Sequence, residues 1–424
     1  MLKKIFSLNS WIRYIKTIHN IPIDLSLDRV KFVAKKLGLL HPSSFVITVG
    51  GTNGKGTTCA LLENILLSYG LKVGVYSSPH LFKYTERIRI QGNELPENIH
   101  IQAISKVNFF RKLISLSYFE FITLTALLIF KQSLLDVIIL EVGLGGKLDA
   151  TNIIDADISI ITSIAIDHIK FLGSNRDLIA IEKFGIFRKK KPAIIGEINI
   201  PKSALKYIKE IGSKFYFYNK DWWWKIQNNY KWKWCNKTHT IKDLKLPNIP
   251  IQNAATALTA LNASPFLISK YNIQKGLSKT KLFGRFQIIN TSPITILDVA
   301  HNPHASQYLS RYLVKKIKKI KKLRVMIGVM KDKDIYGIIN SFNISVHEWY
   351  CVSLNTSRAA NAEQISMHIN HDKIKKFNKL ILAWNKINSD SSFDDCILIF
   401  GSFRIVKEII NLTKFKKTSY FYKY

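Results

Sequence analysis

The chain has 424 residues, which is long enough for two domains that each bury a hydrophobic core. Hydrophobic residues make up 47% and charged residues 22%, a balance typical of a globular protein and unlike that of a disordered chain. The net charge of +34 is extreme and raises the question of a nucleic-acid partner.

The distribution of the lysines argues against such a partner. They are spread along the whole chain together with many isoleucine and asparagine residues, as an AT-biased genome would impose. The densest cluster runs from Lys315 to Lys322 and alternates with apolar residues, which predicts an exposed helix face. No nucleic-acid-binding motif stands beside it. We therefore expect no nucleic-acid partner, and we interpret the charge as a positive field that attracts anionic substrates.

Three features bear on where the chain works. No apolar run reaches the roughly 18 residues that a transmembrane helix needs, so we expect no membrane span. The segment Met1–Phe6 is basic but lacks the long apolar core and cleavage site of a secretion signal, and we expect a cytoplasmic protein. The four cysteines lack C-x-x-C spacing, which favours reduced structural thiols over disulfides or a zinc site.

The first predicted elements in chain order surround a glycine-rich loop. An apolar run over 45–49 predicts a strand, and apolar residues at helical spacing over 59–69 predict a helix. The sequence between them is Val49-Gly50-Gly51-Thr52-Asn53-Gly54-Lys55-Gly56-Thr57-Thr58. This is the layout of a phosphate-binding loop, in which backbone N–H groups and a lysine bind phosphates and a hydroxyl binds Mg²⁺. Because Gly56 separates Lys55 from Thr57, we predict an ATP site of a variant kind; a glycine-rich turn without a ligand is the alternative.

Strand-like and helix-like segments alternate through the rest of the chain. The predicted strands of the first part are 73–76, 136–142, 158–164 and 193–195, and its predicted helices are 98–113, 120–131 and 177–184. The aromatic segment 222–246 is predicted to form an antiparallel excursion packed on the main sheet; stacking of its tryptophans on bases is the weaker alternative. A second alternation has predicted strands at 294–299, 324–329, 348–352 and 396–400, and predicted helices at 303–317 and 335–342.

The sequence thus predicts an α/β fold with two domains. Residues 1–284 form a phosphate-loop domain with a mainly parallel sheet, and residues 285–424 form a smaller, Rossmann-like open α/β domain. We expect a cleft between them.

Chemistry-bearing residues follow several predicted strands. Ser78 follows strand 73–76, Glu141 lies at the end of strand 136–142, and His168 ends an apolar run that begins at residue 158. Because the carboxyl ends of parallel strands meet at one edge, these residues and Thr57 are predicted to share one site. Oxygen ligands with one imidazole suit Mg²⁺. Each residue alone has an ordinary structural explanation, as does Lys183 on the next helix, but their order after a phosphate loop favours function.

In this order the motifs resemble the Mur ligase superfamily and, within it, the bifunctional dihydrofolate synthase/folylpolyglutamate synthases of bacteria. The resemblance covers nearly the whole chain. Its most specific segments are 51–57, 77–81, 84–89, 140–146, 148–152, 182–187, 284–287 and 298–304. It implies an ATP- and pterin-binding, Mur-ligase-like domain at 1–284, a glutamate-ligase domain at 285–424, and a monomer.

The resemblance also implies an activity and a set of site residues. The family joins a carboxylate to L-glutamate with ATP, through an acyl phosphate; the acceptors here would be dihydropteroate and the tail of tetrahydrofolate. By resemblance, the ATP-binding residues are Thr52, Asn53, Gly54, Lys55, Gly56, Thr57, Asn253, Arg285 and Asp298. Two Mg²⁺ sites are implied, the first held by Thr57, Ser78 and Glu141 and the second by His168. The implied catalytic residues are Lys55, Lys183 and His301, and Lys183 matches a position that CO₂ carbamylates in the family.

A pterin pocket distinguishes the bifunctional enzymes from those that only extend folate tails. The residues that match its lining are Asp24, Leu25, Ser26, Leu27, Ser117, Tyr118, Phe119, Glu120, Leu148, Asp149 and Ala150. Asp149 is suited to accept from the N–H edge of a pterin, and Phe119 to stack on its face. Their presence favours a bifunctional enzyme.

Several alternatives stay open. One is an enzyme that only extends folate tails. A cell-wall Mur ligase would carry a further N-terminal domain of about 100 residues, whereas 44 residues precede the first predicted strand here. A nucleotide switch would not require the set Glu141, His168 and Lys183. A nucleic-acid-binding protein would shift DNA in a salt-dependent way.

Overall fold

The computed structural model describes residues 7–21, 23–317 and 320–413. The chain divides into two compact units, Met1–Lys281 and Leu282–Tyr424. Each unit is described by itself.

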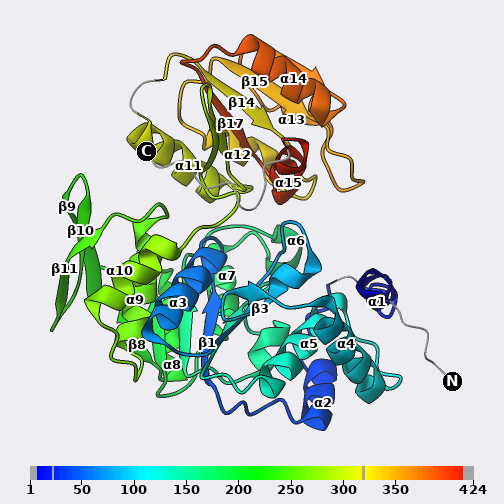
Figure 1. The fold of residues 1–424 in the computed structure, drawn as a ribbon, viewed down its shortest axis with the longest axis vertical. Coiled ribbons are helices and arrows are strands. Elements are labelled where there is room, and N and C mark those ends of the chain that lie inside the picture. The colour runs from blue at the N-terminus through cyan, green and yellow to red at the C-terminus, as the bar shows by residue number, and fades with distance from the viewer. Residues whose placement is uncertain (1–6, 22, 318–319, 414–424) are drawn as a thin grey trace. The chain divides into compact units, whose positions relative to one another are not determined.

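Unit 1 contains an eight-stranded sheet with the order β4-β3-β2-β5-β1-β6-β7-β8 (Figure 1). The strands are β1 (Phe45–Gly50), β2 (Val73–Tyr76), β3 (Ile88–Ile90), β4 (Asn93–Glu94), β5 (Val137–Glu141), β6 (Ile158–Ile161), β7 (Pro192–Ile195) and β8 (Lys214–Phe217). From β2 to β8 all neighbours in this order pair in parallel, whereas β3 and β4 add an antiparallel edge.

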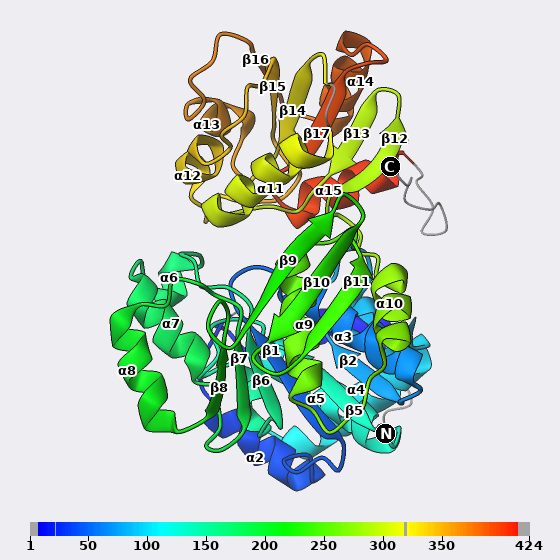
Figure 2. The same cartoon turned by 90° about the vertical axis from the view of Figure 1, so that its left-hand side faces the viewer.

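Helices cover both faces of this sheet (Figures 1 and 2). They are α1 (Leu8–Ile15), α2 (Asp28–Leu37), α3 (Lys55–Tyr69), α4 (Glu97–Arg111), α5 (Tyr118–Gln132), α6 (Ile169–Leu172), α7 (Arg176–Phe184), α8 (Lys202–Ile211), α9 (Ile251–Asn262) and α10 (Lys270–Lys279). Strand β5 shows why both faces are covered: Ile138 and Leu140 join a core with α2, α4 and α5. Val137 and Ile139 join the opposite core with α3, α9 and α10. This alternation follows from the two-residue period of a strand, and burial on both faces is typical of parallel sheets.

A second, antiparallel sheet of unit 1 consists of β9 (Trp222–Asn228), β10 (Lys231–Asn236) and β11 (Thr240–Lys245). Trp222, Trp232 and Trp234 are fully buried in the core that includes α9. The Trp234 indole N–H donates to Thr259 Oγ1 on that helix, at 3.0 Å. The predicted antiparallel excursion is confirmed, and these three tryptophans pack inward instead of offering faces to bases.

Unit 2 is a six-stranded sheet with the order β12-β13-β17-β14-β15-β16 (Figure 2). Its strands are β12 (Gln287–Thr291), β13 (Ile294–Leu297), β14 (Leu323–Ile327), β15 (Glu348–Val352), β16 (Ile374–Phe377) and β17 (Cys396–Phe400). Its helices are α11 (Pro303–Lys316), α12 (Ile335–Asn340), α13 (Ala362–Ser366), α14 (Leu380–Asp390) and α15 (Phe403–Leu412). All neighbours are parallel except β12, which pairs antiparallel with β13.

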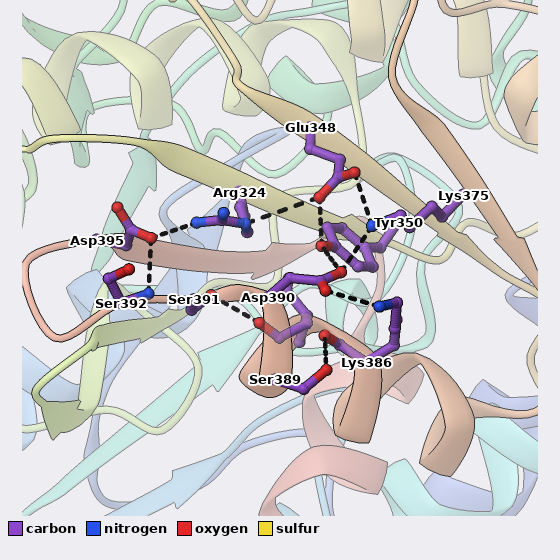
Figure 3. Close-up of polar contacts among 11 residues, drawn as sticks. Arg324, Glu348, Tyr350, Lys375, Lys386, Ser389, Asp390, Ser391, Ser392 and Asp395 are labelled. Carbon is purple, nitrogen blue, oxygen red and sulfur yellow. Dashed lines mark hydrogen bonds and ion pairs between the residues drawn. The ribbon is translucent and has the colours of Figure 1, made fainter.

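A charge network crosses this second sheet (Figure 3). The guanidinium of Arg324 on β14 forms ion pairs with Asp395 and, at 3.7 Å, with Glu348 on β15. The Lys375 ammonium lies 2.8 Å from Glu348 and 2.6 Å from Asp390. Lys386 completes the network by pairing with Asp390 at 2.7 Å. Three cations therefore pair with three carboxylates. This pairing offsets the free-energy cost of removing the buried charges from water.

The predicted α/β fold with a mainly parallel first sheet and an open α/β second unit is confirmed. Among the described residues, no helix is both long enough and apolar enough to cross a bilayer. All four cysteines are buried and free.

Two expectations about local structure are wrong. Strand β6 ends at Ile161, so His168 does not end a strand but lies beyond an irregular segment, at the start of α6. The lysine cluster 315–322 is not one helix face: α11 ends at Lys316, and Lys321 and Lys322 lie in the segment that leads into β14. Lys318 and Lys319 lie outside the described residues. The alternation of lysines with apolar residues continues past the end of α11, so it does not show where the helix ends and the segment before β14 begins.

Candidate active site

The glycine-rich loop joins the carboxyl end of β1 to the amino end of α3, and the segment that follows β6 holds it in place. The Thr52 N–H donates to the Ser163 carbonyl at 2.8 Å, and the Thr162 hydroxyl donates to the Asn53 carbonyl at 2.7 Å. A methyl group at Gly51 would lie 2.0 Å from Thr162 Oγ1, and Gly51 has a φ of +133°. Only glycine allows this close approach. The contacts with Thr162 and Ser163 therefore fix the conformation of the loop.

Lys55 opens α3 directly after Gly54, the N-cap residue. Its ammonium donates to the carbonyls of Gly51 and Thr52 at 2.9 and 3.2 Å, so the lysine folds back over the loop. A methyl group at Gly54 would lie 2.7 Å from the Asn253 side chain at the start of α9. The structure therefore brings Asn253, which the resemblance names as an ATP-binding residue, next to the loop. A lysine and a helix amino end in one loop favour an anionic ligand such as a phosphate.

Three of the predicted metal ligands gather beside this loop. Glu141 ends β5 and is 4% exposed; its Oε2 accepts from the Ser78 N–H at 3.0 Å. A methyl group at Gly56 would lie 3.5 Å from Glu141 Oε1, so the carboxylate faces the first turn of α3, where Thr57 follows. Within the described residues no three His, Cys, Asp or Glu side chains form a cage. One carboxylate with two hydroxyls nevertheless fits Mg²⁺, which keeps waters and takes phosphate oxygens.

Lys183 is a buried lysine on the last turn of α7. It is 4% exposed and lines a cavity of about 20 Å³ together with Lys55, Asp167 and His168. Burial and the neighbouring Lys55 cation lower the pKa of the Lys183 amine to about 7. Asp167 and Glu182 act in the opposite direction. A lysine whose neutral form is populated near neutral pH is a candidate for chemistry.

The glycines of the loop after β5 explain how α7 approaches so closely. A methyl group at Gly146 would lie 2.8 Å from the carbonyl oxygens of Glu182 and Lys183. The Lys147 N–H donates to the Glu182 carbonyl at 2.8 Å. The sequence Gly145-Gly146 thus places the end of α7, and with it Lys183, against this loop.

The residues predicted to bind a pterin come together from three segments. Ser117 caps α5 and exchanges hydrogen bonds with Glu120. Arg29 on α2 links Glu120, at 3.2 Å, to Asp24, at 2.8 Å. A methyl group at Gly143 would lie 2.5 Å from the ring of Phe119, so that ring lies on the loop that follows β5.

Asp149 closes this group from the loop side. It is 2% exposed; Oδ2 accepts from the N–H groups of Gly143 and Leu144, and Oδ1 accepts from the N–H and hydroxyl of Thr151, at 2.7–3.0 Å. Burial raises the pKa of Asp149 in spite of these bonds. The carboxylate therefore braces the loop. Of the other predicted lining residues, Leu25, Ser26, Leu27 and Tyr118 are half-buried, Ala150 is buried, and Leu148 is exposed.

Unit 2 carries a cluster of its own at the carboxyl end of β13. Asp298 accepts from the N–H groups of Phe286 and Ala300, each at 2.8 Å, and burial raises its pKa although Arg285 lowers it. The Arg285 guanidinium lies 5.3 Å from the centre of the Phe403 ring, and the His301 ring centre lies 5.9 Å from it. His301 Nδ1 lies 2.8 Å from the Val299 carbonyl, so Nδ1 carries the proton. The structure thus gathers Arg285, Asp298 and His301.

Several residues with clear roles escaped the sequence reasoning. Thr162 and Ser163 hold the phosphate loop, Arg29 joins two predicted pterin segments, and the Phe403 ring lies close to both Arg285 and His301. Phe403 follows strand β17, and the rule that sites lie at the carboxyl ends of parallel strands could have found it. Nothing in the sequence around Arg29 signals its two distant partners.

Comparison with known proteins gives a consistent result. The Mur ligase middle domain matches residues 49–293, and the glutamate ligase domain of Mur ligases matches residues 284–403. The dihydrofolate synthase/folylpolyglutamate synthase of Escherichia coli K12 is 46% identical over 405 residues, 96% of this chain and 95% of that protein.

Solved structures agree over almost the whole length. E. coli FolC in complex with DHPP and ADP is 44% identical, with a TM-score of 0.94 over 99% of this chain and 100% of that one. A bifunctional folylpolyglutamate synthase/dihydrofolate synthase with Mn, AMPPNP and L-glutamate bound is 44% identical, with a TM-score of 0.91 over 97% of this chain and 98% of that one. The chain therefore belongs to the Mur ligase family, and within it to the bifunctional dihydrofolate synthase/folylpolyglutamate synthases.

Proposed function

We propose that the chain joins L-glutamate to the carboxylate of dihydropteroate and to the glutamate tail of tetrahydrofolates, with ATP as the energy source. It is an ATP-dependent ligase of folate metabolism, as the family is. One observation carries the proposal for this chain: Lys55 of the phosphate loop and the buried Lys183 line one cavity, next to the loop that contacts Phe119 and Asp149.

The reaction that fits this site has two steps. A carboxylate oxygen of the pteroate attacks the γ-phosphorus of ATP, the bond to ADP breaks, and an acyl phosphate forms. The amine of glutamate then attacks the acyl carbon, phosphate leaves, and one proton is lost from nitrogen. Phosphoryl transfer depends on positioning and charge neutralisation more than on covalent chemistry of the protein. Lys55 and the loop N–H groups supply both.

Thr57, Ser78 and Glu141 are the residues we assign to a first divalent cation, and His168 to a second. Mg²⁺ at these positions would neutralise charge on the phosphate oxygens when bound. The relative with bound Mn and AMPPNP supports a divalent metal and ATP as ligands. That there are two sites is our proposal, and it rests on His168 lining the cavity of Lys55 and Lys183.

Lys183 is proposed to carry a carbamate. Its neutral amine would add to the carbon of CO₂ and lose one proton, which turns a buried cation into an anion. The lowered pKa supplies the neutral amine near pH 7. The cavity that Lys183 shares with His168 supports this role, because a carbamate on Lys183 would then face the cation that we assign to His168.

The two proposed domains receive separate roles. Residues 1–284 bind ATP and the pterin, with Asn253 as a further ATP contact, and residues 285–424 form the glutamate-ligase domain. Arg285 and Asp298 are assigned to the nucleotide, and His301, whose Nε2 has the lone pair in the neutral ring, to the incoming glutamate or the reaction centre. We also propose a cytoplasmic monomer.

The pterin is proposed to lie among the segments that contain Asp24, Phe119 and Asp149. The relative that holds DHPP and ADP supports such a pocket. Because both oxygens of Asp149 already accept hydrogen bonds, a pterin N–H edge would share them with the loop. Leu148 and Ala150 flank this carboxylate.

An isotope experiment tests the proposed reaction. Dihydropteroate labelled with ¹⁸O in its carboxylate is supplied with Mg-ATP and L-glutamate, and the released phosphate is analysed by mass spectrometry. We expect one ¹⁸O in the phosphate for each glutamate added, because the carboxylate oxygen bridges to phosphorus in the acyl phosphate. Phosphate without ¹⁸O alongside labelled product would contradict this route.

A further inference from the structure

A second cavity lies in unit 2, away from the cluster of Arg285, Asp298 and His301. It has a volume of about 530 Å³ and is lined by residues 320–323, 344–347 and 371–373. These segments lead into β14, β15 and β16. Because the strands are parallel, the cavity lies at their amino ends, whereas the Asp298 cluster follows the carboxyl end of β13 in the same sheet. Its size is that of a small-molecule pocket.

The charges around this cavity are mostly positive. Lys322 and Lys373 are exposed, and neither has an ion-pair partner among the residues that the structure describes. Lys321 pairs with Asp394 at 3.3 Å, and Asp372 is the one carboxylate in the lining. Two unpaired lysines therefore face one carboxylate. Lys322 belongs to the lysine cluster 315–322, for which the proposed ligase reaction has no use.

The network of Figure 3 does not neutralise this surplus. Arg324 and Glu348 come one residue after the cavity lining, but their charges are already matched within that network. The lysines of the cavity remain outside it.

The pKa of His347 reflects the positive electrostatic potential in the cavity. Partial burial and the nearby cations Lys373, Lys322 and Arg324 lower the pKa of its imidazole, against the opposite effect of Glu348. The second imidazole, His371, has a fixed structural role: Nδ1 accepts from the Lys373 N–H, and Nε2 donates to the Val346 carbonyl, both at 2.9 Å. His371 thereby holds the backbone of Lys373 against the segment before β15.

We infer that this cavity binds a small molecule that carries two or more anionic oxygen groups, with Lys322 and Lys373 as the cations that contact it. The shared chemistry is that of an oligophosphate or an oligocarboxylate. Such a ligand supplies the counter-charge that the lining lacks. The inference stands apart from the proposed function, since none of these residues has a role in that reaction.

The test follows His347 by NMR in full-length protein labelled with ¹³C in its histidine rings, with H347Q for assignment. Pyrophosphate and γ-linked triglutamate are titrated separately at an ionic strength of about 0.15 M, where long-range screening is strong. We expect one of the probes to raise the pKa of His347, because a bound anion offsets the field of Lys373 and Lys322. The probe that acts identifies the ligand as a phosphate or a carboxylate species.

Charge reversal separates this site from general attraction to a basic protein. In the K322E/K373E variant we expect affinity at His347 to fall about tenfold or more, while the pKa of His347 without probe rises. K379E changes an exposed lysine beyond the other end of β16 and should leave probe affinity unchanged. The inference is overturned if neither probe moves His347, or if K322E/K373E binds as tightly as the unmodified protein.

Discussion

At the scale of single residues, Lys183 stands out in the candidate active site because it is a buried lysine with a strongly lowered pKa. It is 4% exposed, beside the Lys55 cation, with an amine pKa of about 7. A buried lysine that stayed protonated next to a second cation would lower the stability of the folded protein, because a buried charge needs a partner of opposite sign. Conversion to a carbamate removes that conflict, which is why we give this residue a chemical role.

Replacing Lys183 with alanine should therefore lower turnover about a hundredfold or more, the size of effect seen when one buried electrostatic group is removed. K183R keeps the positive charge but cannot form a carbamate under these conditions, and it should be equally impaired. Steady-state ADP release measures both, and acetate or bicarbonate should partly restore K183A. Unchanged turnover in K183A would sink the carbamate proposal.

The same residue predicts a pH dependence of stability. The pKa of Lys183 is lowered from 10.5 to about 7 in the folded state, so between these values the unfolded chain binds more protons than the folded one. Stability of the unmodified protein should rise with pH across this window, by at most about 1.4 kcal/mol per pH unit from this group. Urea unfolding at pH 7 and pH 9 in CO₂-free buffer, compared with K183M, measures the difference. Parallel curves for the two proteins would show that the amine is not perturbed.

At the scale of elements, the sequence identified long apolar segments well. The bounds of β2 (Val73–Tyr76), β15 (Glu348–Val352) and β17 (Cys396–Phe400) were predicted to the residue, because each is a short buried run between clear breaks. Strand β16 and helices α13 to α15 were not predicted, since their apolar positions are few or interrupted. The predicted strand at 158–164 ran on past Ile161 because an apolar run does not reveal that Thr162 turns to bind Asn53.

The contact between Gly143 and Phe119 is an element-scale constraint that a variant can test. A methyl group in G143A would lie 2.5 Å from the Phe119 ring. We expect a loss of about 1 to 3 kcal/mol in unfolding free energy from overpacking, together with weaker dihydropteroate binding. Adding F119L should recover much of the stability, because the smaller side chain makes room. Additive losses in the double variant would show that the two residues do not meet.

The three-stranded sheet β9–β11 makes a second prediction of this kind. Trp234 is fully buried and hydrogen-bonded to Thr259, whereas Tyr230 in the turn that joins β9 to β10 is 80% exposed. W234A should lose about 3 to 5 kcal/mol, and Y230A should stay within about 0.5 kcal/mol. Urea unfolding followed by circular dichroism measures both. Similar losses of stability in W234A and Y230A would mean that Trp234 does not pack against α9.

At the scale of the whole molecule, the order of motifs predicted more than any single motif did. The phosphate loop, Ser78 and Glu141 were predicted to meet from the rule that parallel strands end at one edge, and the structure places them together in unit 1. Lys183, singled out by its place in the order of motifs, lines the same cavity as Lys55. The rule worked less well for His168, which reaches the cavity through an irregular segment and not from a strand end. Contacts made by side chains of distant segments, such as Arg29 with Asp24 and Glu120, have no local signature and required the structure.

The charge of +34 also belongs to this scale. A field of this sign raises the local concentration of ATP and folate carboxylates and is weakened by salt. It does not make the chain a nucleic-acid protein by itself: Trp222, Trp232 and Trp234, three of the tryptophans in the segment 222–246, are buried and offer no face to bases.

The most direct test of the central claim is ADP release by the purified protein with each substrate omitted in turn. With Mg-ATP and L-glutamate present, we predict ADP release with dihydropteroate and, in a separate reaction, with tetrahydrofolate, and none when glutamate or both acceptors are left out. ADP release with tetrahydrofolate but not with dihydropteroate would contradict the bifunctional assignment and leave an enzyme that only extends folate tails. No release with either acceptor would contradict the ligase reaction as a whole.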